Sequence, residues 1–175
     1  MTARMPTLSA SRTANRNSIA LAVLRIAAGC LFLIFAQYKV FGTQFTLHGG
    51  FQWWINQFLH QGSAYPKMVP VLQNFVLAHA TAIAFVVAYG ELAIGLGLVL
   101  GIWVRVASAF GFVYMLLLLF SSNYPGDHAP LWQYFGASLD HSVLALCFVA
   151  FMVGNSNELL SVRKRRRTHA ASFSG

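Results

Sequence analysis

The architecture of this chain follows from residues 89–105, Tyr89-Gly-Glu-Leu-Ala-Ile-Gly-Leu-Gly-Leu-Val-Leu-Gly-Ile-Trp-Val-Arg105. It is the second half of an apolar segment that begins near Phe75, and it holds one carboxylate, Glu91. Small residues recur in it at every fourth position, a spacing that lets helix backbones approach closely in a membrane. An ionisable side chain inside hydrocarbon is costly, so Glu91 predicts a buried pairing partner or a functional site.

The composition places most of this chain out of water. Of its 175 residues, 57% are hydrophobic and 9% are charged, whereas a soluble domain carries about 25% charged residues. The net charge is +8, and much of the excess lies in 1–18 and in the cluster at 163–167. Such terminal cations are typical of the cytoplasmic flanks of membrane proteins, which also attract anionic lipid. We therefore expect membrane lipid as a partner and no nucleic acid.

Four apolar segments predict four membrane-spanning helices, over 19–41, 75–101, 106–120 and 139–153. Residues 1–18 are polar and predict a disordered tail. A cleaved signal peptide is the competing interpretation, since Ala27-Ala28-Gly29-Cys30 resembles a lipoprotein cleavage site. Arg25 would then interrupt the apolar core of the signal, and the apolar run continues past Cys30, so an uncleaved first span is favoured.

The first connector, 42–74, is too long for a simple turn. Its segment Phe51–Leu59 is aromatic and amphipathic, which favours a short helix lying at the membrane interface. Such a helix could be a plain anchor or a lid over the outer mouth, and we favour the anchor. The sequence thus predicts an all-α integral membrane four-helix bundle with a short interfacial helix in the first outer connector.

The distribution of cations predicts the orientation of the bundle. Three Lys or Arg precede the first span, one closes the 101–105 connection and five follow the fourth span, whereas the two other connectors hold only Lys67. This asymmetry places both termini in the cytoplasm of a multi-pass protein of the bacterial inner membrane. The domains expected are a tail at 1–18, a membrane domain at 19–154 and a basic cytoplasmic tail at 155–175.

Four charged residues in or beside the spans predict two ion pairs, because isolated charges in a bundle would be expensive. Arg25 lies about 9 Å in from the start of its span and Glu91 about 15 Å in from Gly101, at 1.5 Å per residue. We therefore expect an inner Arg25–Glu91 pair. Lys39 and Asp140 both lie near the outer surface, which predicts an outer pair.

Two interpretations of these charges are open from the sequence. They could only fix which helix faces which, or they could line a polar pocket with His141 and Tyr38 whose donors bind a quinone and carry its protons. Haem ligation by His79 and His141 is conceivable but weak, and no His pair at helical spacing predicts a metal site. Cys30 and Cys147 form no Cys-x-x-Cys, which removes support for a thiol–disulfide relay.

Several short stretches resemble the DoxX/DoxD family of small four-helix bacterial membrane proteins. The second span carries Gly90-Glu91, Ile94-Gly95-Leu96 and Leu100-Gly101-Ile102-Trp103-Val104-Arg105, and the first carries Leu24-Arg25, Gly29-Cys30-Leu31-Phe32 and Lys39-Val40-Phe41-Gly42. The similarity covers roughly 21–153. The long aromatic connector looks more like the DoxD-like members, which include the membrane subunit of thiosulfate:quinone oxidoreductase.

The resemblance implies a membrane-integral subunit of a quinone-linked oxidoreductase complex, with quinone as the lipid-soluble cofactor and a partner subunit as a source of electrons. It maps charged family positions onto Arg25, Lys39, Glu91 and Arg105. Phe35-Ala36 stands where many members carry His-Gly, so that histidine is missing from any site here. The catalytic candidates are Glu91, Arg25 and His141, and the quinone-binding candidates are Lys39, Asp140 and Tyr38.

Two other functions remain open from the sequence. One is a proton-coupled carrier for a small solute with Glu91 as the titrating group, although no inverted repeat or broken helix is evident. The other is a non-catalytic assembly or anchoring protein whose charges only set helix packing.

Overall fold

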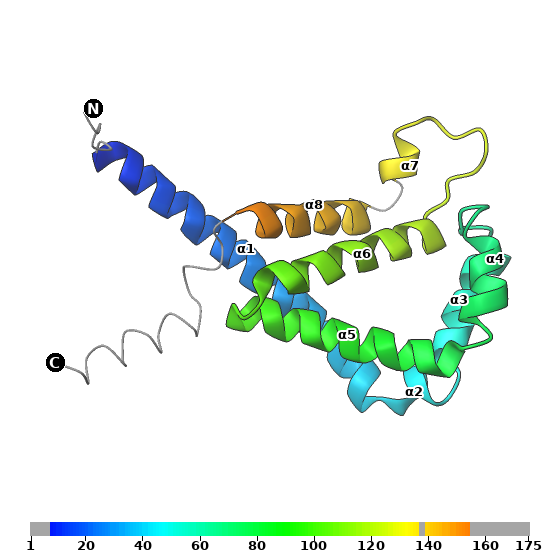
Figure 1. The fold of residues 1–175 in the computed structure, drawn as a ribbon. Helices are drawn as coiled ribbons and strands as arrows, with labels where there is room; N and C mark the ends of the chain where they lie inside the picture. Colours follow the sequence, from blue (N-terminus) through cyan, green and yellow to red (C-terminus); the bar gives the residue numbers. More distant parts are fainter. Residues whose placement is uncertain (1–7, 137–138, 155–175) are drawn as a thin grey trace.

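The first span is one long helix, α1, which runs from Leu8 to Phe41 (Figure 1). The computed structural model describes residues 8–136 and 139–154 of the chain. The helix begins before the predicted start of the span at Ile19, and so it includes part of the segment predicted as a disordered tail. Its membrane-compatible part is Arg16–Phe41. Ala22, Ala28, Phe32 and Ala36 lie buried along the inward face of this part.

Short helices fill the first connector, in the order α2 (Thr43–Thr46), α3 (Gly50–His60), α4 (Val69–Val71) and η1 (Leu72–Val76). The predicted amphipathic helix is confirmed as α3. Phe51 and Ile55 are buried beneath it, while Trp53 and Trp54 stay 54% and 51% exposed on its outer side. Gly49, with φ +79°, starts this helix from the left-handed region that favours glycine.

The second span, α5, runs from Ala80 to Leu100 and starts later than the predicted Phe75. The π-helical turn of η1 precedes it, and His79 then leaves helical geometry, with φ −118° and ψ 27°. The His79 Nδ1 atom lies 2.9 Å from the carbonyl oxygen of Phe75. The apolar pattern continued across this break, which is why the sequence placed the start too early.

The remaining helices are α6 (Val104–Ser122), α7 (Gln133–Gly136) and α8 (Leu139–Val153). Within residues 8–136 and 139–154, the three helices α1, α5 and α6 are long and apolar enough to cross a membrane, and α8 adds a shorter apolar helix. The bounds of α8 are those predicted for the fourth span. The predicted all-α membrane bundle is confirmed, with three long helices and one short one.

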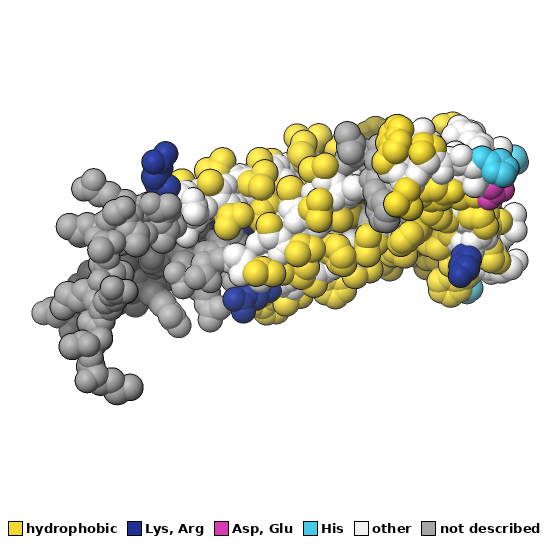
Figure 2. Space-filling view, turned by 90° about the horizontal axis from the view of Figure 1, so that it is seen from above, with side chains coloured by type: hydrophobic (Ala, Val, Ile, Leu, Met, Phe, Trp, Pro, Cys, Tyr) yellow, Lys and Arg dark blue, Asp and Glu magenta, His cyan; other side chains and the backbone are white. Residues whose placement is uncertain are grey.

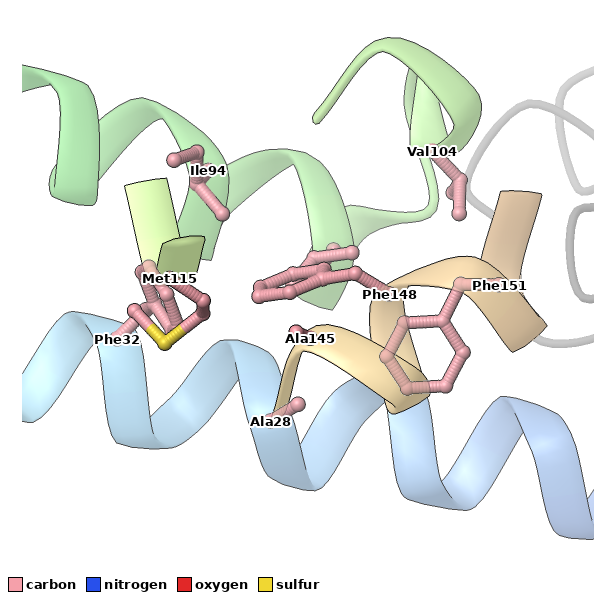
Figure 3. Packing of buried hydrophobic residues seen from close by; sticks show 9 residues of the cluster. Ala28, Phe32, Ile94, Val104, Met115, Ala145, Phe148 and Phe151 are labelled. Carbon is pink, nitrogen blue, oxygen red and sulfur yellow. The ribbon is translucent and has the colours of Figure 1, made fainter. Parts of the chain in front are cut away.

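The long helices associate as two close pairs, α1 with α5 and α6 with α8. Glycines make both contacts possible. A Cβ at Gly29 would lie 3.0 Å from the carbonyl oxygen of Gly95, and a Cβ at Gly111 would lie 2.4 Å from the ring of Phe148. Figure 3 shows Phe148 and Phe32 in the core where the two pairs meet. The bundle is therefore built from two pairs that share one apolar core.

The outside of the bundle is apolar along its length. Val86, Leu146 and Phe110 are 71%, 69% and 66% exposed. In Figure 2 hydrophobic side chains cover the flank, and the charged ones gather at the two ends. Exposed apolar area of this extent marks a surface that faces lipid or a partner. Together with the long apolar helices it describes a multi-pass membrane protein.

Candidate functional site

Glu91 is the centre of a buried polar cluster inside the bundle. It lies on the inward face of α5, in register with Ala84 and Ala88 before it and Leu98 after it. Its side chain is 5% exposed. The small neighbours of Glu91 let α1 and α6 approach, and these two helices supply its partners.

Lys39, in the last turn of α1, forms the ion pair with Glu91. Its Nζ atom lies 2.5 Å from Oε1 of Glu91. The same Nζ atom lies 5.0 Å from the centroid of the Phe45 ring, in cation–π position. A charge in hydrocarbon is stabilised by both contacts, so the cluster explains how the chain tolerates a carboxylate in its second span.

Tyr114 of α6 completes the cluster and was not among the predicted site residues. Its hydroxyl donates to Oε1 of Glu91, the oxygen that Lys39 also contacts. Its ring meets the Phe32 ring edge-on, with centroids 6.4 Å apart. The signal for Tyr114 was present as a single phenol in the middle of a leucine-rich span, where a buried hydroxyl needs a hydrogen-bond partner.

The two oxygens of Glu91 differ in their contacts. Oε1 accepts from both Lys39 and Tyr114. Oε2 is buried and accepts no hydrogen bond within the described part of the chain. A carboxylate with one saturated oxygen and one open oxygen can still accept or carry a proton at the open one.

The predicted inner ion pair was wrong in its partner. Glu91 pairs with Lys39 and not with Arg25. The predicted outer pair of Lys39 with Asp140 stays a prediction, because the side chain of Asp140 lies outside the described residues. The helices α1 and α5 are antiparallel, with Gly29 beside Gly95. Arg25 lies one turn beyond Gly29 in one direction and Glu91 one turn beyond Gly95 in the other, so they are about 12 Å apart along the axis. The predicted pair was wrong because the depths of Arg25 and Glu91 were each counted from the end of its own span, and the two span ends do not lie at one level.

The other predicted site residues do not join this cluster in the described contacts. Arg25 is fully buried further along the core. Tyr38 is 72% exposed and points outward, where it lines a shallow open hollow with Gln37, Phe41 and Gly42. His141 is half-buried in the first turn of α8. The side chain of Asp140 lies outside the described residues, so its predicted role stays a prediction.

A second polar network joins the first connector to the segment that follows α6. The Tyr65 hydroxyl donates to the carbonyl oxygen of Tyr134 at 2.9 Å, and the Tyr134 hydroxyl donates to that of Gly126 at 2.8 Å. Tyr124 donates to the carboxylate of Asp127, and this bond raises the pKa of Tyr124 to about 12. Tyr65, Tyr124, Asp127 and Tyr134 thus form a clasp between these two parts of the chain.

Metal chemistry has no visible support in the described residues. No group of three or more His, Cys, Asp or Glu side chains gathers there. The polar cluster around Glu91 thus consists of an ammonium, a carboxylate and a phenol, and the guanidinium of Arg25 is buried further along the core.

Three long apolar helices, a shorter fourth and a charged cluster in their interior define a multi-pass helical membrane protein with a buried polar site. The family model described as DoxX matches residues 20–123, more than half of the chain. The chain belongs to the DoxX family, which confirms the resemblance seen in the sequence. The matched segment contains Lys39, Glu91 and Tyr114 and ends before Asp140. No curated protein and no solved structure matches the chain.

Proposed function

We propose that this chain is the membrane-integral subunit of a quinone-linked oxidoreductase complex, and that a quinone substrate exchanges a proton with Glu91. The single observation that carries the proposal is the asymmetry of the Glu91 carboxylate. Oε1 holds two donors and Oε2 holds none from the described residues, in a site closed by apolar side chains.

The residues around Glu91 fit the chemistry of a quinone head group. A quinone is a flat ring with two carbonyl oxygens, and it needs aromatic walls, hydrogen-bond donors and a proton carrier. Phe32 and Phe45 supply rings beside the cluster, and Lys39 and Tyr114 supply donors. A carboxyl group that gains and loses a proton beside them supplies the carrier.

Reduction of a quinone consumes two electrons and two protons. We assign the electrons to a partner subunit or a small external reductant, because the sequence carries no flavin, iron–sulfur or haem motif. Glu91 gives one proton as its Oε2–H bond breaks and an O–H bond forms on the substrate, and it recovers that proton from water. Lys39 and Tyr114 stabilise the carboxylate that results, and the second proton comes from solvent.

The DoxD-like character of the aromatic connector makes thiosulfate the first electron donor to test. The cation distribution supports an orientation in the bacterial inner membrane with both termini in the cytoplasm. In that orientation Lys39 lies near the outer end of α1, and Glu91 lies near the middle of α5. Asp140 and His141, at the start of α8, are candidates for the outer edge of the same site.

The test is quinol formation by membranes that contain the full chain with its native partners. A short-chain ubiquinone analogue and thiosulfate would be supplied, and quinone absorbance followed. We expect the Glu91→Gln variant to lose most of the turnover. Tyr89→Phe is the matched control because Tyr89, two residues away, is 52% exposed and stacks on Phe85 outside the cluster.

Binding of the quinone analogue to the purified protein gives a readout that does not depend on the donor. It would be followed by quenching of tryptophan fluorescence. A folded Glu91→Gln protein with unchanged binding and turnover would refute the proposal. Solute uptake that follows a pH gradient and is lost in Glu91→Gln would instead support the alternative function, a proton-coupled carrier for a small solute.

A further inference from the structure

Tyr114 reaches Glu91 from the other helix pair. Lys39 and Glu91 belong to the α1–α5 pair, whereas Tyr114 belongs to the α6–α8 pair. The hydrogen bond from Tyr114 to Glu91 therefore crosses the seam between the pairs. Among the residues that the structure describes, this is the side-chain hydrogen bond that joins α5 to α6 within the membrane segments.

The ring of Tyr114 is held in place by its packing. It lies against the core that contains Phe32 and Phe148, and it meets Phe32 edge-on. One turn earlier, Gly111 brings α6 onto the ring of Phe148. The direction from which the hydroxyl approaches Glu91 is thus fixed by the core, whereas Lys39 sits on a flexible four-carbon stem.

We propose that Tyr114 is a positioning residue that decides which oxygen of Glu91 exchanges protons. A carboxylate oxygen has about two acceptor sites, and Lys39 and Tyr114 together fill those of Oε1. Two donors from different helix pairs also stop the carboxylate from turning about its last torsion. Oε2 is left as the oxygen open to a ligand that carries a hydroxyl or N–H donor, such as a quinol.

The claim that Tyr114 positions the Glu91 carboxylate does not depend on the proposed function. Only the expected effect of Tyr114 on quinone turnover rests on that function. A Tyr114 that merely satisfies its own hydroxyl would affect stability when changed. It would not change the chemical reactivity of Glu91. The reactivity of the carboxyl group is therefore the measurement that separates the two roles.

The experiment uses dicyclohexylcarbodiimide, an apolar reagent that modifies protonated carboxyl groups within membranes. The full chain would be labelled in its native membranes at pH 7, and modification of Glu91 quantified by mass spectrometry of its peptide. In Tyr114→Phe the carboxylate loses one charge-assisted donor, so its ionised form is less stabilised and the carboxyl group reacts more readily with the reagent. We expect labelling to become about tenfold faster than in the wild type.

Tyr89→Phe is again the matched control and should label at the wild-type rate. Lys39→Met removes the other donor and should also accelerate labelling. If Tyr114→Phe does not give folded protein by gel filtration, Tyr114→Leu provides the same loss of the hydroxyl. Labelling in a folded Tyr114 variant at the rate of the wild type and of Tyr89→Phe would overturn the proposal.

Turnover with the quinone analogue then tests the catalytic consequence separately. We expect Tyr114→Phe to lower kcat about tenfold with little change in KM, because proton exchange and not binding is affected. If Tyr114→Phe is labelled faster than the wild type but the wild type shows no quinone turnover, the positioning role of Tyr114 is supported and the proposed function is refuted. If Tyr114→Phe is labelled at the wild-type rate and has a raised KM with unchanged kcat, both the positioning role and its effect on proton exchange are contradicted.

Discussion

Removing Lys39 should leave a buried carboxylate with only Tyr114 as its donor. The Lys39→Met variant keeps the apolar stem and deletes the charge. Breaking a buried ion pair from one side costs about 3–5 kcal/mol. Lys39 is 19% exposed and the Tyr114 hydrogen bond remains, so we expect a loss of about 3 kcal/mol, near the low end of that range.

The double variant Lys39→Met/Glu91→Leu should recover most of that loss. Replacing both members of a buried pair by apolar side chains of similar size is often neutral. We expect the double variant to lie within about 1 kcal/mol of the wild type, which corresponds to a coupling energy of about 2–3 kcal/mol. Arg25→Met combined with Glu91→Leu should give a coupling near zero, because the two residues are separated along the axis.

The assay is unfolding by sodium dodecyl sulfate in mixed micelles, followed by helical circular dichroism. Lys67→Met is the control for loss of a lysine, since Lys67 is exposed in the first connector. The reasoning is refuted if the double variant Lys39→Met/Glu91→Leu is as unstable as the two single variants combined. It is also refuted if the coupling belongs to Arg25 and not to Lys39.

Two further predictions concern helix packing and the clasp. Gly111→Ala should cost about 1–3 kcal/mol in the same assay, because its Cβ would lie 2.4 Å from the Phe148 ring, while Gly90→Ala should be harmless since nothing lies within 4 Å of its Cβ. The bond to Asp127 raises the pKa of Tyr124 to about 12 from 10.0, so its stabilisation is complete below pH 10 and is lost as the pH rises through 12. In an absorbance titration of tyrosinate, Asp127→Asn should move that late step to lower pH, and an unchanged titration would contradict the assignment.

The membrane fold could be read from the sequence because it depends on local properties. Apolar runs long enough to cross hydrocarbon can satisfy their backbone only as helices, so α1, α6 and α8 were located without any tertiary contact. The helix α3 followed from its aromatic, amphipathic pattern in the same way. The start of α5 was misplaced because a π-helical turn leaves no mark on hydropathy.

The existence of a charged site was also determined by the sequence alone. A carboxylate such as Glu91 in hydrocarbon must have a partner, whatever the arrangement of helices, because the cost of isolating it is too high. The identity of the partner was a different matter. Arg25 and Lys39 were both available on the same helix, and simple depth along each helix favoured the wrong one.

Only the tertiary structure decided the pairing and brought in Tyr114. The close approach of Gly29 to Gly95 fixes how far α1 is shifted along α5, and with this shift the side chain of Lys39, and not that of Arg25, reaches Glu91. Tyr114 enters from a separate helix pair, whose position depends on the shared core. Apolar side chains pack in many registers at similar energy, so hydropathy cannot specify which of them brings the polar groups together.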